Sequence, residues 1–196
     1  MDVYELIQKR RTIRRFEQKP VPKDLLERCV NAARIGPSGA NLQPLEYIVV
    51  SEPEQCQRVF PHTAWAGYLP DWSPSPEERP TAYIFILTNR NVRASAPMDV
   101  GIAAQSITLV ALAEGVGSCM IGSLDHKALR QVLAVPQHCD ISLAVALGYP
   151  AEQPQMVEVT GDSIKYYRDE DGILKVPKRA LEDVLHWQRY TEKITE

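Results

Sequence analysis

The sequence predicts a mixed α/β or α+β chain of 196 residues that folds as one domain. Three observations predict this fold class. Stretches with apolar residues at helical spacing alternate with short apolar runs that are typical of buried strands. Hydrophobic residues make up 44% and charged residues 24%, which is globular usage with ample material for a core. No glycine-rich turn leads from a strand pattern into a helix pattern, so a dinucleotide-fold signature is absent.

Two helices are expected within the first forty residues. Asp2 can cap the first, with Glu5 as its capping-box partner, and the basic run KRRTIRR follows. The second helix should end at Gly36, which precedes a proline. Its apolar face contains Leu25, Leu26, Cys29, Val30 and Ala33. The next stretch, LEYIVV, predicts a buried strand.

Residues 61–80 predict an irregular loop or lid. Five prolines exclude long regular structure, and three large aromatic side chains indicate that the segment packs on other residues. The prolines are Pro61, Pro70, Pro74, Pro76 and Pro80. The aromatic residues are Trp65, Tyr68 and Trp72.

Strand and helix patterns alternate after this lid. AYIFIL predicts a strand, and PMDVGIAAQSITLVALAEGVG predicts a long helix that is apolar nearly all round, which indicates a buried, central position. SCMIG predicts a short strand, residues 124–133 a short helix, and ISLAVALGYP another strand. From about Thr160 we expect a hairpin with Asp171 and Gly172 at its turn, and ALEDVLHW predicts a last helix.

Charge and composition exclude several classes of protein. The net charge of -3 argues against a general nucleic-acid binder. No apolar stretch is long enough to span a bilayer, and the first residues have no signal-peptide core. The four cysteines form no CxxC pair, so we expect reduced core thiols in a cytoplasmic protein.

Three further candidate sites are excluded by their sequence context. GVGSCMIG follows a helix pattern instead of a strand, so it is not a dinucleotide fingerprint. Ser38 lies between a helix and a strand, which is the reverse of the order that a nucleophile elbow requires. The four histidines show no metal-ligand spacing, so no metal site is expected.

Two clusters of cationic residues are candidates for anion binding. Arg10, Arg11 and Arg14 fall within five residues and suggest an anion site, although cations near a helix end can also be plain surface charges. Lys178 and Arg179 precede the expected last helix, where a cation is unfavourable unless an anion binds there. Alternatively, these two side chains simply point to solvent.

The stretch GPSGANLQP, residues 36–44, is richer in special residues than a helix-to-strand connection needs. Pro37 and Gly39 shape its backbone, and Ser38, Asn41 and Gln43 offer donors and acceptors at alternating positions. Such a loop could bind the edge of a planar heterocycle, because glycine lets a flat ring approach the backbone. It could equally be an elaborate helix cap.

Five segments together resemble the FMN-dependent nitroreductase family. They are KRRTIRRF, PSGANLQP, DVGIAAQSITLVALAEGVGSCMIG, ISLAVALGYP and VPKRALEDV, and they cover nearly the whole chain in the family's order. The resemblance implies a nitroreductase-like α+β fold with a central, mostly antiparallel sheet flanked by helices. It also implies an intertwined homodimer in which a C-terminal arm, from about residue 160 to 196, wraps over the partner subunit.

The resemblance implies two FMN sites across the dimer interface. Arg10, Arg11, Thr12 and Arg14 would hold the phosphate and ribityl chain, with Arg14 reaching toward the pyrimidine edge. The other subunit would supply part of the loop at 36–44. These loop residues would be Pro37, Ser38, Gly39, Asn41 and Gln43.

Two further segments are implied in the same site. Ile121 and Gly122 would place backbone N–H groups against flavin N5 and O4. Lys178 and Arg179 would close on the phosphate. None of these residues would act as a nucleophile or base, because the flavin N5 is the reactive atom and Arg14 gives electrostatic support.

The activity that the resemblance implies is hydride transfer from NADH or NADPH, through FMN, to nitroaromatic, quinone or similar electron-poor small molecules. One face that serves donor and acceptor in turn predicts ping-pong kinetics. Other chemistry on the same fold is an alternative, such as reductive dehalogenation, flavin fragmentation or ring oxidation. A non-catalytic FMN-binding protein is a third. The sequence leaves the physiological acceptor open.

Overall fold

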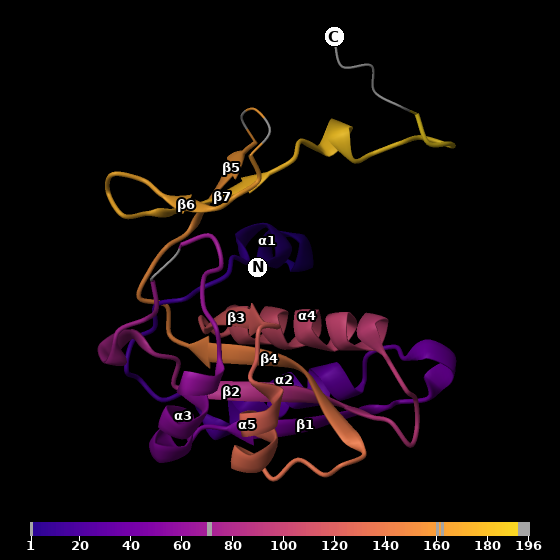
Figure 1. Ribbon diagram of the computed structural model, residues 1–196. Helices are drawn as coiled ribbons and strands as arrows, with labels where there is room; N and C mark the ends of the chain where they lie inside the picture. Colours follow the sequence, from indigo (N-terminus) through magenta and orange to yellow (C-terminus); the bar gives the residue numbers. More distant parts are fainter. Residues whose placement is uncertain (1, 70–71, 160, 162, 192–196) are drawn as a thin grey trace. The chain divides into compact units, whose positions relative to one another are not determined.

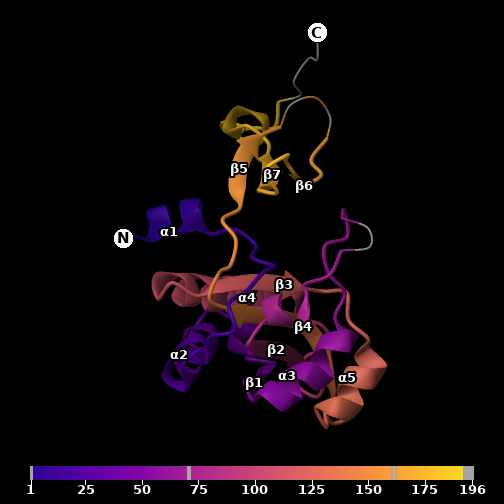
Figure 2. The ribbon, with the colours of Figure 1, turned by 90° about the vertical axis from the view of Figure 1, so that its left-hand side faces the viewer.

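A four-stranded antiparallel sheet forms the centre of the computed structural model, which describes residues 2–69, 72–159, 161 and 163–191. The strand order is β1-β2-β4-β3, and helices cover both faces of the sheet (Figures 1 and 2). The strands are β1 (Leu45–Val50), β2 (Ala82–Asn89), β3 (Gly117–Ile121) and β4 (Cys139–Gly148). The predicted α+β class, with its antiparallel sheet and flanking helices, is therefore confirmed.

The position of each strand in the sheet explains its sequence pattern. β2 is paired on both sides, with β1 and β4, and its residues from Ala82 to Thr88 are all buried. A strand covered on both faces reads as a continuous apolar run, as AYIFIL does. β1 lies at the edge, and only Val50 in it is fully buried. The prediction that LEYIVV is a buried strand was therefore right about the strand and wrong about its burial.

Helices α2 (Lys23–Arg34) and α4 (Pro97–Ala113) pack on one face of the sheet (Figure 2). The apolar face predicted for α2 is confirmed, and α4 buries small residues such as Ala103, Ala104 and Ala111. The opposite side of α4 stays open in a single chain, where Met98 is 69% exposed and Ile102 38%. The prediction that this helix is buried on all sides is therefore not fulfilled within one chain.

Helices α3 (Pro53–Val59) and α5 (His126–Val132) cover the other face. Asp125 caps α5 by accepting a hydrogen bond from the Ala128 N–H at 3.0 Å. The sequence analysis missed α3, a short helix that begins at a proline and buries Cys56 and Val59. All four cysteines are buried and unbonded to one another, as expected. No described helix is long and apolar enough to cross a membrane.

Helix α1 (Val3–Lys9) begins with the predicted capping box. The Asp2 side chain accepts from the Glu5 N–H at 2.8 Å, and the Glu5 side chain accepts from the Asp2 N–H at 3.2 Å. The helix has no buried residue, and Val3 and Tyr4 are exposed. Local capping instead of core packing therefore defines where this helix begins.

The contacts divide the chain into two units, one up to Glu152 and one from Gln153 onward. The second unit has a three-stranded sheet in the order β5-β7-β6. Its strands are β5 (Gln155–Glu158), β6 (Tyr167–Arg168) and β7 (Leu174–Lys178). The predicted hairpin is confirmed, with Gly172 at its turn in a left-handed conformation of φ 75°. Whether this unit is an exchanged arm stays a prediction, and residues 192–196 of that arm lie outside the described part.

The predicted last helix, ALEDVLHW, is wrong. Only one 3-10 turn, Leu181–Asp183, forms there. Leu181 and Trp187 are 69% and 73% exposed, so the apolar side chains have no buried face on which a helix could pack. A short isolated helix is marginal in water without such packing.

Candidate functional site

The arginine-rich segment runs beside strand β3. Thr12 forms an isolated parallel bridge with Ser118, and the Ile13 N–H donates to the Ser118 carbonyl at 2.9 Å. Gly117 permits this approach, because a Cβ at that position would lie 2.7 Å from Cγ1 of Ile13. The segment from Arg10 to Arg14 is thereby fixed along the edge strand of the sheet.

Two neighbouring arginines interact at the start of this segment. Arg10 and Arg11 are both half-buried, and Nη1 of Arg11 donates to the Arg10 carbonyl at 2.5 Å. Burial, and secondly the charge of Arg10, lower the pKa of Arg11. Within the described part of the chain, neither arginine forms an ion pair with a carboxylate. Such a pair of cations favours a bound anion.

Arg14 lies in a more balanced environment. Its N–H donates to Oε1 of Glu152 at 2.6 Å. Both residues lie near the thiol of Cys119, whose pKa is raised to about 11 by burial, while the charge of Arg14 acts to lower it and that of Glu152 to raise it. Arg14 therefore lies near both a carboxylate and the buried thiol of a β3 residue.

The segment 61–80 packs close to the same strand end. Thr63 forms an antiparallel bridge with Leu124, two residues after Gly122, and the Ala64 N–H donates to the Ser123 carbonyl at 3.0 Å. Near its other end, Glu78 accepts from the Phe16 N–H at 3.0 Å. The lid therefore connects the residues after β3 with the residues after Arg14.

Two aromatic residues of the lid pack on other side chains, as predicted. Trp65 stacks on Phe60 at 5.9 Å between ring centroids, and the Arg15 guanidinium lies 5.9 Å from the Trp72 ring. Tyr68 is 48% exposed. The described parts of residues 61–80 contain only turns, a bridge and 3-10 turns, which confirms the irregular structure; Pro70 and Asp71 lie outside the described residues.

The loop at 36–44 is held by a buried carboxylate that the sequence analysis missed. Asp99, in the first turn of α4, is only 4% exposed, and its Oδ2 accepts from Oγ of Ser38 at 2.5 Å. Oγ of Ser38 in turn accepts from the Gln43 N–H at 2.9 Å. An acidic residue in the first turn of a helix is common, so no local pattern indicates this contact.

The backbone of this loop is strained. Ala40, Asn41 and Gln43 all have φ between 51° and 54°, in the left-handed region that side chains other than glycine rarely adopt. Gly39 has no Cβ, and one built there would lie 2.6 Å from Nη1 of Arg93. Strain of this kind persists only where the surroundings fix the backbone, and it is concentrated at functional sites.

A hollow of about 140 Å³ opens where this loop meets α4 and β1. Its lining includes Pro37, Ser38, Gln43, Asp99 and Ile102. Asn41 is exposed at the loop's tip, and the amide of Gln43 donates to its carbonyl at 3.2 Å. The loop therefore lines a cavity, and whether it binds the edge of a planar heterocycle or only caps a helix stays a prediction.

One chain places the loop and the arginines at different ends of α4. The loop is fixed at the first turn of that helix by Asp99, whereas Thr12 pairs with Ser118, which follows the helix's last turn. A helix of 17 residues is roughly 25 Å long. A single chain therefore does not unite the two halves of the predicted site.

The remaining predicted residues divide between the two units. Ile121 ends β3 with a buried side chain, and Gly122 follows it in an exposed position. Lys178 is the last residue of β7, and Nη2 of Arg179 donates to the Asp183 carbonyl at 2.7 Å. No α-helix begins after them in residues 179–191, so the expectation of two cations at a helix N-terminus was wrong. Their convergence with Arg10 and Arg11 stays a prediction.

Comparison with known proteins gives the family. The sequence matches the profile described as Nitroreductase family over residues 7–71 and 71–149. The chain belongs to the nitroreductase family. As a member it is an oxidoreductase of the NAD(P)H nitroreductase type, and the predicted nitroreductase-like fold is confirmed.

Individual relatives of this nitroreductase show how its family varies. A protein of Methanothermobacter thermautotrophicus, provisionally named NADH dehydrogenase/NAD(P)H nitroreductase, is 29% identical over 160 residues, covering 79% of this chain and 80% of the relative. Iodotyrosine deiodinase of Nematostella vectensis is 25% identical over 189 residues, covering 81% and 71%. The solved FMN-dependent nitroreductase of Clostridium difficile has a TM-score of 0.70 at 24% identity, covering 96% and 100%.

Proposed function

We propose that the protein binds FMN and transfers hydride from NADH or NADPH to electron-poor small molecules. The observation that carries this proposal is the pair of half-buried guanidinium groups of Arg10 and Arg11, which lack a carboxylate partner in the described chain and lie beside β3. A phosphate monoester carries about -1.5 to -2 charges and three acceptor oxygens, so it fits this pair. Guanidinium groups also match its geometry better than ammonium groups do.

The residues near the proposed flavin have distinct roles. Arg10, Arg11 and the Thr12 hydroxyl hold the phosphate and ribityl chain. The backbone N–H groups of Ile121 and Gly122 orient the ring, and Arg14 stabilises negative charge at its pyrimidine edge. When bound, FMN supplies the hydride-accepting and hydride-donating chemistry. The chain itself needs no nucleophile, and binding of donor and acceptor in turn on one face gives ping-pong kinetics.

A second subunit completes the site in this proposal. Ile102 of α4 lines the same hollow as the loop at 36–44. Met98 of α4, Leu42 in the loop and Ile35 just before it are also exposed. An apolar patch of this kind marks a protein interface. Burying it against a second copy would bring the partner's loop to the arginines of this chain, with Pro37, Ser38, Gly39, Asn41 and Gln43 framing the ring.

The C-terminal unit is proposed to cover the partner subunit. Its last described stretch exposes several large apolar side chains, which are Leu181, Val184, Leu185, Trp187 and Tyr190. Such side chains are stabilised when another surface covers them. Lys178 and Arg179 precede this stretch, and in an exchanged arm they would add two positive charges at the phosphate.

Anaerobic titration of the purified, FMN-loaded protein tests the proposal. We expect NADH or NADPH to bleach the flavin spectrum, and a nitroaromatic compound or quinone to restore it. Arg10→Ala combined with Arg11→Ala should weaken FMN binding by at least about tenfold, since a charge-assisted bond contributes roughly 1.5–3 kcal/mol. Arg58→Ala is the control, because Arg58 is an exposed arginine of α3 whose Nη1 donates to Oε1 of Gln55 at 3.1 Å. Unaltered FMN affinity in the double variant, or a flavin that neither nicotinamide reduces, contradicts the proposal.

Reductive dehalogenation is the second candidate function, favoured by the likeness to iodotyrosine deiodinases. The lid of residues 61–80, with its three large aromatic residues, offers a surface for an aromatic substrate. Iodotyrosine added to the reduced enzyme distinguishes the two functions. Reoxidation of the flavin with release of iodide selects dehalogenation, whereas reoxidation by quinones and nitroaromatics alone selects the first function.

A further inference from the structure

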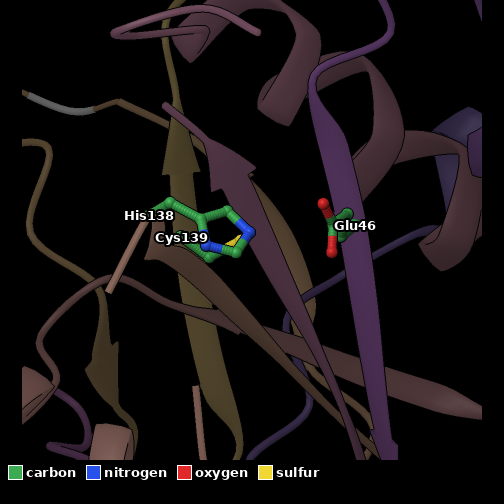
Figure 3. Close-up of side chains that lie close together, drawn as sticks. All are labelled: Glu46, His138 and Cys139. Carbon is green, nitrogen blue, oxygen red and sulfur yellow. The ribbon is translucent and has the colours of Figure 1, made fainter. Parts of the chain in front are cut away.

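Three side chains with metal-ligand chemistry meet on the sheet, outside the proposed flavin site. They are Glu46, His138 and Cys139, and one ligand atom from each lies within 4.8 Å of the others. Figure 3 shows the His138 imidazole directed toward Glu46, with the Cys139 sulfur alongside the ring. Sequence spacing did not reveal the group, because the pairing of strands brings Glu46 to the other two residues.

The sheet register explains the meeting. Glu46 in β1 pairs with Leu87 of β2, and Cys139 in β4 pairs with Asn89 of the same strand. Leu87 and Asn89 are two residues apart, so their side chains project from the same face of the sheet. His138 belongs to the turn just before β4. The three ligand groups therefore come from β1, from β4 and from the turn before β4, and so from both sides of β2.

Backbone and side-chain contacts hold this group in place. Nδ2 of Asn89 donates to Oε1 of Glu46 at 2.7 Å, and Oδ1 of Asn89 accepts from the Asn91 N–H at 3.0 Å. These two bonds fix the orientation of the Asn89 amide, which contacts Oε1 of Glu46 and leaves Oε2 available to a metal ion. The His138 carbonyl accepts from the Arg90 N–H at 2.8 Å, which pins its backbone. An oriented carboxylate is typical of the outer-shell support around metal ligands.

Two of the three ligand groups, the His138 imidazole and the Cys139 thiol, form no side-chain hydrogen bond within the described part of the chain. Among the described residues, no hydrogen bond involves the ring nitrogens of His138 or Sγ of Cys139. Cys139 itself is fully buried, whereas Glu46 is exposed and His138 half-buried, so the group opens to solvent on one side. A thiol, an imidazole and a carboxylate together form a ligand set that suits metal ions of borderline softness.

We propose that Glu46, His138 and Cys139 bind a zinc ion, with water in the fourth position. Zn²⁺ prefers a tetrahedral shell of sulfur, nitrogen and oxygen ligands at about 2.0–2.3 Å, which requires ligand atoms roughly 3.5 Å apart. The separations here, up to 4.8 Å, must close by about an ångström. The exposed Glu46 side chain and the half-buried imidazole have the freedom to make this adjustment.

The charges around the site are compatible with a dication. Arg90 and Arg130 both form ion pairs with Asp140, at 3.2 Å each, so their positive charge is partly neutralised. Zinc takes cysteine as the thiolate, so binding would displace the thiol proton of Cys139. The charged and titratable groups that face this thiol are Glu46, Arg90, Arg130, His138 and Asp140.

Equilibrium dialysis and X-ray absorption test this site directly. The intact flavoprotein, without an affinity tag and freed of metal by a chelator, is dialysed against Zn²⁺ and analysed for bound metal. We expect one Zn²⁺ per chain, with one sulfur at about 2.3 Å and nitrogen or oxygen at about 2.0–2.1 Å in the absorption spectrum. Neither readout depends on the flavin, so the result stands apart from the proposed enzymatic function.

Variants identify the ligands. Cys139→Ser should remove the sulfur from the spectrum, and Glu46→Gln, an exposed change that leaves the fold intact, should lower affinity at least tenfold. Asn89→Ala should lower it by about 10–100-fold, as loss of an outer-shell partner does. Cys56→Ala and His62→Gln are matched controls and should bind as the wild type does. Absence of stoichiometric zinc, a shell without sulfur, sulfur that persists in Cys139→Ser, or full affinity in Glu46→Gln overturns the proposal.

Discussion

Ser38 shows how one hydroxyl group can be occupied by the fold. Its Oγ donates to Asp99 and accepts from the backbone of Gln43, so both capacities are used inside the loop. The residue therefore shapes the loop that frames the proposed ring site, while the exposed Asn41 has its side chain available for a ligand. Asp99 is the positioning residue on which this arrangement depends.

Replacing the buried carboxylate should loosen the strained loop. We expect Asp99→Asn to lower the free energy of unfolding by about 1–3 kcal/mol, because a charge-assisted hydrogen bond to Ser38 is lost or weakened. Chemical denaturation measures this change. Ser38→Ala should lower the free energy of unfolding less in the Asp99→Asn variant than in the wild type, since both changes remove the same bond. Glu114→Gln, at the exposed end of the same helix, is the control. This role is contradicted if the two changes are strictly additive, or if Asp99→Asn is as stable as Glu114→Gln.

The buried thiol of Cys56 should make the stability of the protein depend on pH in the alkaline range. Burial, and secondly the charge of Glu52, raise the pKa of Cys56 from 9.0 to about 11. A raised pKa contributes stability that is complete below pH 9 and is lost as pH rises through about 11. The free energy of unfolding should therefore fall less steeply between these pH values in Cys56→Ala than in the wild type. Equal slopes in denaturation series across that range would show that this thiol ionises freely in the folded chain.

At the level of elements, the segment after α1 depends on glycine. Gly117 lies against Ile13, and Gly148 lies against Phe16, where an added Cβ would come within 2.8 Å of Cδ1 of the ring. Phe16 is fully buried and pairs with Pro150. The strands β3 and β4 thus provide a smooth backbone surface on which the arginine-bearing segment rests.

Gly117→Ala should displace that segment. Its Cβ would meet Ile13 at 2.7 Å, so we expect a loss of about 1–3 kcal/mol in the free energy of unfolding and weaker FMN binding. Gly67→Ala is the control, because nothing lies within 4 Å of its Cβ position. Denaturation and flavin titration measure the two effects. If both glycine variants match the wild type, the close packing of the segment on β3 is not required.

Local signals explain which elements could be predicted. The capping box of Asp2 and Glu5 acts within one turn, and β2 owes its apolar run to burial on both faces, so each was readable from sequence. The helix expected at 180–187 failed because its apolar residues have no core to face. The contact of Ser38 with Asp99 depends on tertiary structure alone, and no local pattern encodes it.

For the whole molecule, α4 carries the argument for a dimer. Its mean apolar character predicted burial on all sides, and one chain buries only the side that faces the sheet. Assembly of two copies would resolve this difference, since it would cover Met98 and Ile102 and would bring a neighbouring loop to Arg10 and Arg11. The family resemblance predicted both the site residues and the sharing of the site between chains, and the open face of α4 supports the proposed dimer.

Ile102→Glu should therefore prevent association. A carboxylate on this face would have to be buried without a partner, which costs several kcal/mol. Light scattering should show a monomer with little bound FMN. Val92→Glu is the matched control, because Val92 is similarly exposed, at 44% against 38% for Ile102, but follows β2 instead of lying on α4. A dimer that persists in Ile102→Glu places the interface elsewhere.

The separation of the arginines from the strained loop along α4 has a genetic consequence. If each catalytic centre takes one half from each protomer, a chain damaged at Arg10 and Arg11 and a chain damaged at Asp99 can rescue each other. In a hybrid of the two, both lesions fall in one centre and the other centre is intact. Co-expression of two inactive alleles would then restore up to half of the normal turnover per hybrid, which is complementation within a single gene.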